Sequence, residues 1–242
     1  MANTIAVVGA GPGIGFAVAE RFGAEGFRVA LIARRTKSLD DLAAKLREKG
    51  IDAAGFSADV LDRSALTKSL GEAIAHFGAI DVLEYGPAPT RDSLRTPKAM
   101  DVENEQFHLD LAVLGAITAV RVVLPGLLER KSGALLFTTA VSAQYPVPHT
   151  ASFGVAAGAA LNYARLLYQD LKPDGIYAGI VSVAGMVVQR GQETGMSPTG
   201  LPLVAAQDVA DAHWRLYTER NTPEAIVGDA NVFKALSARG RE

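Results

Sequence analysis

The sequence predicts an α/β fold in which a doubly wound parallel sheet forms a single domain over residues 1–242. Short apolar runs alternate along the chain with segments that carry apolar residues at helical spacing. Such runs are typical of parallel strands that are buried on both faces. We find no linker and no internal repeat between them, so the repeated strand–helix units predict one sheet with right-handed crossovers.

The expected elements follow one another in a regular order. The predicted strands are 5–8, 28–32, 53–57, 80–85, 134–139 and 176–183. The predicted helices are 16–22, 38–46 with Ser38 as N-cap, 66–77, about 100–124 before a disturbance at Pro125, 152–171 and a last one at 208–217. Residues 86–100 are expected to form a loop at the carboxyl end of a strand. Residues 186–206 contain Gly, Pro, Ser and Thr with little periodicity, so we expect a mobile loop there.

A glycine-rich turn lies between the first predicted strand and the first helix. It contains Gly9, Gly11, Gly13 and Gly15. Glycines let the backbone approach a pyrophosphate closely, and a helix N-terminus supplies free N–H groups at the positive end of its dipole. Strand, glycine turn and helix together therefore predict a dinucleotide-binding site. The alternative is a tight turn that keeps its glycines and binds nothing.

Composition narrows the class of protein. Apolar residues make up 49% of the chain and charged residues 21%, which is typical of a soluble globular protein. A net charge of −2 gives no reason to expect nucleic acid or an acidic membrane surface as partner. The longest apolar stretch, 111–124, contains Arg121 and is too short to span a bilayer. With a strand beginning within four residues of the N-terminus, no room is expected for a signal peptide, so we expect a cytoplasmic protein.

Cysteine and histidine usage excludes several kinds of site. The chain has no cysteine, so disulfides, thiolate metal sites and a cysteine nucleophile are excluded. Its four histidines are scattered without metal-ligand spacing, so no metal site is expected.

The spacing of the glycine turn indicates a family. Gly9-x-x-x-Gly13-Ile14-Gly15 resembles the T-G-x-x-x-G-I-G turn of the short-chain dehydrogenase/reductase family, with Val8 in place of the usual Thr. The resemblance extends over nearly the whole chain. It implies a Rossmann-type domain, a nicotinamide cofactor and oxidoreductase chemistry on a small molecule.

Two arginines favour NADP(H) over NAD(H). An NAD site has an acidic residue about 20 positions after the glycines, whereas arginine accommodates a 2′-phosphate. Here Arg34 and Arg35 follow the second strand, and no acid does. The alternative is a solvated basic pair on a loop.

The resemblance assigns further cofactor positions. Asp59 and Val60 resemble the family's Asp-Val pair beside the adenine, and Val187 is the position whose backbone would hold the nicotinamide carboxamide. The family's D-V-L-V-N-N-A-G segment reads D-V-L-E-Y-G-P-A from Asp81, so Tyr85 and Gly86 replace its two asparagines.

The same register places the family's catalytic Asn, Ser, Tyr and Lys on residues that cannot do their chemistry. These positions hold Ala112, Ala140, Phe153 and Ala157. The family's tyrosine protonates the oxygen of a reduced carbonyl, and its serine donates a hydrogen bond to it. General acid catalysis is worth roughly 10²–10⁴ in rate and one oxyanion donor about 10²–10³. Standard carbonyl reduction is therefore expected to be absent or very slow.

Neighbouring polar residues are candidates to substitute. Thr139 lies beside Ala140, while Tyr145 and His149 fall on the loop before the Phe153 helix. The alternative is that Tyr145 and His149 are pocket wall. His213 and Trp214 are expected to have packing or surface roles.

Three functions stay open. The first is non-standard chemistry with NADP(H), either hydride transfer or a cyclisation or isomerisation. The second is a catalytically silent nucleotide-binding subunit that regulates a partner, and the third is an interaction subunit that binds no nucleotide. The resemblance also implies a homodimer or homotetramer through the 100–124 and 152–171 helices, where residues 156–160 are small.

Overall fold

The chain forms one seven-stranded sheet in the order β10-β6-β5-β4-β1-β2-β3. All of its pairings are parallel, for example Val8 of β1 opposite both Ile32 of β2 and Tyr85 of β4. The strand order reverses between β1 and β4, which opens a crevice at the carboxyl ends of these strands. The predicted α/β class and the doubly wound sheet are confirmed.

The computed structural model describes residues 2–188, 192, 194–198 and 200–239. The strands of the main sheet are β1 Thr4–Val8, β2 Arg28–Ala33, β3 Ala53–Ser57, β4 Val82–Tyr85, β5 Gly133–Ala140, β6 Ile176–Ala184 and β10 Glu224–Gly228. The helices are α1 Ile14–Ala24, α2 Thr36–Arg47, α3 Arg63–Phe77, α4 Val102–Leu109, α5 Gly115–Arg130, α6 Ala151–Leu171, α7 Ala206–Glu219 and α8 Ala230–Arg239.

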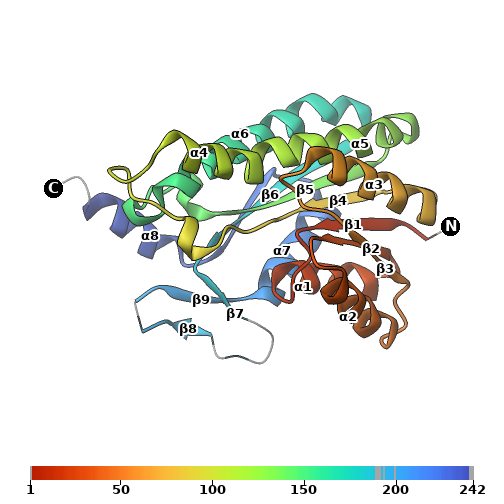
Figure 1. Ribbon diagram of the computed structural model, residues 1–242, viewed down its shortest axis with the longest axis horizontal. Coiled ribbons are helices and arrows are strands. Elements are labelled where there is room, and N and C mark those ends of the chain that lie inside the picture. Colours follow the sequence, from red (N-terminus) through yellow and green to blue (C-terminus); the bar gives the residue numbers. More distant parts are fainter. Residues whose placement is uncertain (1, 189–191, 193, 199, 240–242) are drawn as a thin grey trace.

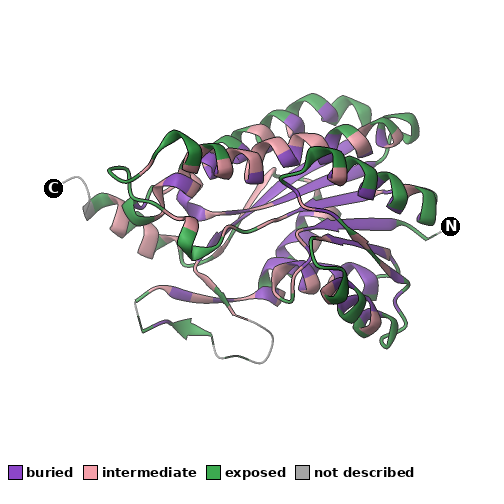
Figure 2. Cartoon of the chain, viewed as in Figure 1, coloured by how far each residue is buried: buried purple, intermediate pink, exposed green. Residues whose placement is uncertain are grey.

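Two helical layers cover the sheet. Helices α1, α2 and α7 lie on one face, and α3 to α6 lie on the other (Figure 1). The strands between them are buried along most of their length (Figure 2). Alternate residues of each strand therefore enter two separate cores, such as Val7 with Phe22 of α1 on one face and Val8 with Leu70 of α3 on the other.

The region expected to be a mobile loop contains a second, small sheet. Its strands are β7 Met186–Val188, β8 Gly195–Met196 and β9 Pro202–Ala205, in the order β7-β9-β8. Residues 189–191, 193 and 199 of that region lie outside the described part of the chain. The small sheet projects beyond the carboxyl ends of the main strands (Figure 1).

The prediction for the C-terminal part of the chain was wrong. The helix predicted as the last one is followed by β10, which extends the main sheet, and by α8. Strand β10 is an edge strand with no fully buried residue, so its sequence lacks the apolar run of the inner strands. The predicted N-cap Ser38 was also wrong, because α2 begins at Thr36 and Arg35 is its N-cap.

The long helix continues past Pro125. A π-helical turn, Asp110–Leu114, joins α4 to α5, and α5 ends only at Arg130. Arg121, whose carbonyl loses its helical donor at Pro125, is exposed, so water can bond that carbonyl. The rod Val102–Arg130 could cross a membrane by length and composition alone. It packs against α3 and α6, which accounts for its apolar face.

Candidate functional site

The glycine turn is built for a close backbone approach. Gly9 has φ +94°, and a Cβ atom there would lie 2.7 Å from the backbone nitrogen of Pro87, in the turn after β4. A Cβ atom on Gly15 would lie 2.9 Å from the Cα of Ala10. Both contacts are shorter than real Cβ atoms allow, so these two positions require glycine. The turns after β1 and β4 can thus pack together at the crevice.

Among the described residues, no acidic side chain of the first turn and no side-chain cap neutralises the positive end of the helix dipole at the start of α1. Gly13 is its N-cap and supplies no side chain, and the first turn has no acidic residue. The first N–H groups of a helix have no intrahelical acceptor, and the dipole is positive there. Ile14 and Gly15 therefore lie where an anion would be bound, as the glycine pattern predicts.

A cavity of about 210 Å³ lies beside this turn at the carboxyl ends of β1, β2 and β3. It brings together most of the predicted cofactor residues, namely Gly9, Gly11, Arg34, Arg35, Asp59 and Val60. Gly13, Ile14 and Gly15 lie at the adjoining helix start rather than in its lining. The cavity is thus shared between the glycine turn and the segments that follow β2 and β3.

The two arginines leave the cavity positively charged. The guanidinium of Arg34 is 69% exposed, and its nearest carboxylate oxygen, on Asp59, is 4.0 Å away. Within the described residues Arg35 makes no ion pair. Neither guanidinium is neutralised by a close partner, so both can receive an anionic group.

A larger cavity of about 700 Å³ opens at the carboxyl ends of β5 and β6. Ala140 and Phe153 line it, together with Met186 and Leu201 of the small-sheet region and Phe233 of α8. Its size and largely apolar walls are those of a small-molecule site.

The residues aligned with the family's catalytic set come together in an apolar place. Ala112 lies in the π-helical turn, and it lines, with Phe153, a cavity of only about 10 Å³. Ala157 is fully buried one turn after Phe153. His108 lies against the Phe153 ring, with centroids 5.9 Å apart. That these positions correspond to the catalytic set stays a prediction.

Tyr85 fills the space beside the π-helical turn. Its hydroxyl donates a hydrogen bond to the carbonyl of Leu111 at 2.6 Å, and burial raises its pKa far above the usual value. A side chain on Gly115 would collide with that hydroxyl. A large residue at 85 and a glycine at 115 therefore fit one another around the helix defect.

A buried polar cluster lies on the face of the sheet that α1, α2 and α7 cover, and it includes His213, which was expected to have a packing or surface role. Thr138 Oγ1 lies 2.6 Å from Glu84 Oε1, to which it donates, and 2.8 Å from His213 Nε2. Burial raises the pKa of Glu84 to about 7, although the Thr138 hydrogen bond opposes this, and burial lowers the pKa of His213 to about 3. The one signal in the sequence is an acid inside the apolar strand β4.

The candidate substitutes do not share one cavity. Thr139 lines the small cavity beside Phe153, and His149 lines the large one. Tyr145 lines neither, because its ring packs under Lys234 of α8 at 5.3 Å. Val187 lies in β7 opposite Val204 of β9. Within the described residues no group of three His, Asp or Glu side chains could hold a metal ion.

Comparison with known proteins agrees with this geometry. The short chain dehydrogenase family profile matches residues 3–196. A short chain dehydrogenase of Pseudocercospora fijiensis is 29% identical over 176 residues, which cover 72% of this chain and 56% of that protein's length.

Two solved structures share the fold. L-sorbose reductase from Gluconobacter frateurii, complexed with NADPH and L-sorbose, superimposes with a TM-score of 0.81 at 22% identity, covering 93% of this chain and 94% of that one. A short chain oxidoreductase from Pseudomonas aeruginosa, described as containing an atypical catalytic centre, gives 0.80 at 22% identity with the same coverages.

Proposed function

Because the chain belongs to the short-chain dehydrogenase family, we propose that it binds NADP(H) and acts on a small organic molecule by non-standard chemistry. One observation carries the proposal. A positively charged cavity beside the glycine turn lies at the same sheet edge as a large apolar cavity, and the latter is lined by Phe153, which the resemblance predicts at the family's proton-donor position.

The chain's own residues fit the cofactor. The backbone of Gly9 and Gly11 and the start of α1 would receive the pyrophosphate, and Arg34 and Arg35 the 2′-phosphate. Asp59 and Val60 line the same cavity where the adenosine would lie. When bound, the nicotinamide supplies or accepts a hydride. The NADPH complex of the sorbose reductase supports this reading.

The chemistry must differ from standard carbonyl reduction. A phenyl ring at 153 cannot give a proton, and Ala140 and Ala157 offer neither a hydroxyl nor an ammonium. Two routes remain. In one, His149 or Thr139 holds the proton for a hydride transfer. In the other, the cavity shapes its ligand for a cyclisation or isomerisation. The Pseudomonas neighbour, which is described as containing an atypical catalytic centre, supports a departure from the standard chemistry.

The second candidate is a catalytically silent nucleotide-binding subunit. It is favoured by the 10 Å³ cavity between Ala112 and Phe153, which leaves almost no room for reacting groups. The two candidates share the cofactor and differ in turnover.

Two measurements separate these functions. NADPH and NADH are titrated by fluorescence, and NADPH oxidation is then followed with a panel of carbonyl compounds. Tight NADPH binding with turnover of some compound supports an enzyme, while binding without turnover favours the silent subunit. Failure to bind either cofactor would refute the proposal.

A further inference from the structure

The lining of the large cavity is mostly apolar, but it includes two side chains that can carry a positive charge. Arg91 and His149 contribute its ionisable side chains, and no aspartate or glutamate lines it among the residues that the structure describes. The other walls are mainly Val, Leu, Phe and Met side chains, including Leu236 of α8. A ligand with an apolar body and a negative charge matches this lining, whereas an amine would find no counter-ion.

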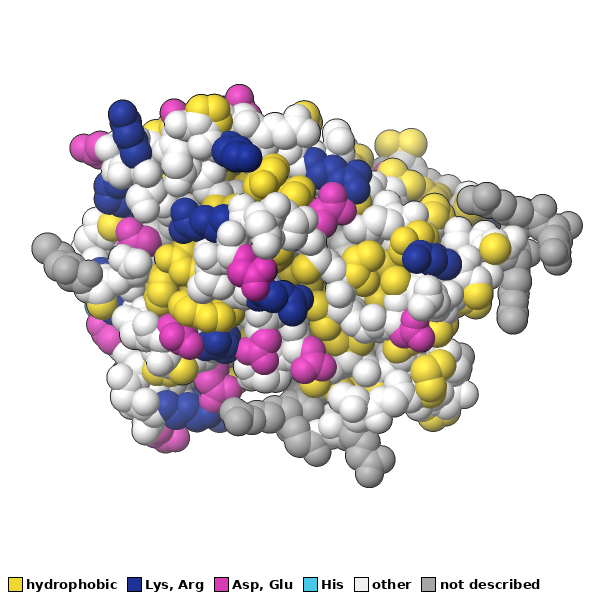
Figure 3. Space-filling model, turned by 180° about the vertical axis from the view of Figure 1, so that it is seen from behind, with side chains coloured by type: hydrophobic (Ala, Val, Ile, Leu, Met, Phe, Trp, Pro, Cys, Tyr) yellow, Lys and Arg dark blue, Asp and Glu magenta, His cyan; other side chains and the backbone are white. Residues whose placement is uncertain are grey.

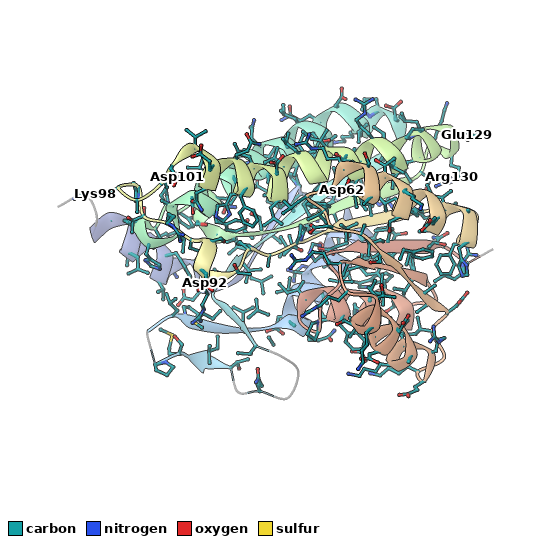
Figure 4. All side chains as sticks on the ribbon, in the orientation of Figure 1. Asp62, Asp92, Lys98, Asp101, Glu129 and Arg130 are labelled. Carbon is teal, nitrogen blue, oxygen red and sulfur yellow. The ribbon has the colours of Figure 1, made fainter. Side chains whose placement is uncertain are left out.

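Arg91 is free to bind an anion. It lies on the short turn Arg91–Ser93 after β4, which faces the small sheet, as the label on its neighbour Asp92 shows (Figure 4). Within the described residues its guanidinium makes no ion pair or side-chain hydrogen bond. A guanidinium presents paired N–H donors that match the two oxygens of a carboxylate.

Ser142 gives a second, independent indication of a ligand. It lines the same cavity, is only 6% exposed, and its Oγ has no hydrogen-bond partner in the described part of the chain. A buried hydroxyl without a partner costs free energy, so such groups are rare in folded proteins. An oxygen atom of a bound ligand would satisfy it.

We propose that this cavity binds an organic acid with an extended apolar body. The carboxylate of this acid contacts Arg91, and one of its oxygen atoms forms a hydrogen bond with the Ser142 hydroxyl. The inference rests on the proposed function, for which it names the substrate class. It concerns ligand affinity alone, and binding to the cavity can be measured without turnover and without cofactor.

The test compares three probes of equal chain length, decanoate, 1-decanol and decylamine, by titration calorimetry on the full chain. Decanoate is expected to bind about tenfold more tightly than decanol at low ionic strength, and decylamine more weakly than either. Arg91→Gln should bring decanoate and decanol to within threefold of each other. Lys98→Gln, the same change of charge in the same loop but outside the cavity lining, should leave the preference intact (Figure 4).

Ser142→Ala gives a check on folding. Because the hydroxyl has no protein partner to lose, this variant should keep the melting temperature of the parent, whereas a structural role would lower it. Equal affinities for decanoate and decanol, or a preference that survives Arg91→Gln, would overturn the inference. A parallel NADPH titration keeps the outcomes apart, since loss of NADPH binding with retained decanoate binding refutes only the proposed function.

Discussion

At the scale of single residues, we expect Arg34 and Arg35 to decide the choice of cofactor. Replacing both with alanine should weaken NADPH binding by on the order of 10²- to 10⁴-fold, because two charged hydrogen bonds are lost and each costs about 1.5–3 kcal/mol. NADH affinity should change little, since NADH lacks the 2′-phosphate. Fluorescence titration of both cofactors measures this. Lys37→Ala, an exposed neighbour outside the cavity lining, serves as the charge control. Equal losses for both cofactors would contradict the assignment.

The four positions that the resemblance assigns to the family's catalytic set predict a gain of function. Ala112→Asn, Ala140→Ser, Phe153→Tyr and Ala157→Lys together should create measurable NADPH oxidation with a reactive diketone. Each single change should do little, because such groups act as a unit. Steady-state assays of the parent, the single variants and the fourfold variant decide it. Robust turnover by the parent would instead point to His149 or Thr139 as the proton donor.

The structure adds a condition to this gain of function. The cavity between Ala112 and Phe153 holds only about 10 Å³, and Tyr85 occupies one side of it. Larger side chains would overpack this place at a cost of about 1–3 kcal/mol. Adding Tyr85→Asn, the residue that the family's segment has at this position, should therefore raise the activity of the fourfold variant, while the lost burial and the lost hydrogen bond to Leu111 lower its melting temperature. Unchanged activity would show that Tyr85 does not limit the space.

At the scale of elements, Glu84, Thr138 and His213 link β4, β5 and α7 through one buried cluster. Folding raises the pKa of Glu84 from 4.5 to about 7, so this group costs stability as the pH rises through that window. Folding lowers the pKa of His213 from 6.5 to about 3, so this group costs stability as the pH falls through its own window. Between pH 4.5 and 6.5 the two effects oppose each other.

Glu84→Gln should separate these effects. It removes the cost of ionising a buried carboxyl, which is about 3 kcal/mol above pH 7, and a glutamine oxygen can still accept from Thr138. The variant should melt several degrees higher than the parent at pH 8 and show a much smaller advantage at pH 5. Thermal unfolding across this range measures it, with the exposed Glu48→Gln as control. An equal difference at both pH values would count against the ionisation of Glu84.

The elements also show what a sequence can predict. The inner strands and the glycine turn were predictable, because burial on both faces demands continuous apolar runs such as Ile5–Val8. Strand β10 was not, since an edge strand keeps half-exposed residues and has no such run. The helix was expected to be disturbed at Pro125, but it continues to Arg130. The free-energy cost of this proline is small because it lies at an exposed position of a helix that packs on the sheet.

Site residues could be predicted from the sequence where they come shortly after the end of a strand, because the carboxyl ends of parallel strands meet at one edge of the sheet. Arg34, Asp59 and His149 lie in the expected cavities for this reason. Tyr145 does not, and its ring instead packs against Lys234 of α8, a helix that was not predicted. Arg91 and Ser142 could not be found from the sequence. They stand out only because no described side chain pairs with them, and this is visible only in the folded structure.

At the scale of the whole molecule, the surface indicates which partners to expect. On the face seen in Figure 3, Lys and Arg side chains are interspersed with Asp and Glu, and apolar atoms lie between them. A mixed surface of this kind gives no single-sign field toward nucleic acid. The resemblance to the family predicts a second copy of the chain as partner.

The small residues of α6 only partly face outward. Ala156, Ala157 and Ala160 are buried against the chain's own core, so they cannot mediate helix approach between copies. The outer face of α6 instead carries Val155 and Leu166, which are 54% and 55% exposed, on the same helical layer as α5. Large exposed side chains at helical spacing are typical of an interface that is covered by a partner.

We therefore predict a homodimer or homotetramer in which the outer face of α6 meets its symmetry mate. Light scattering at micromolar concentration should give a multiple of the 25.4 kDa chain mass. Leu166→Glu should lower that mass, because it places two carboxylates against each other across a two-fold axis. Ile226→Glu on the edge strand β10 is the matched comparison, since this side chain is 39% exposed. If only Ile226→Glu lowers the mass, the copies join through the sheet edge, and a parent that is already a 25.4 kDa monomer would exclude both interfaces.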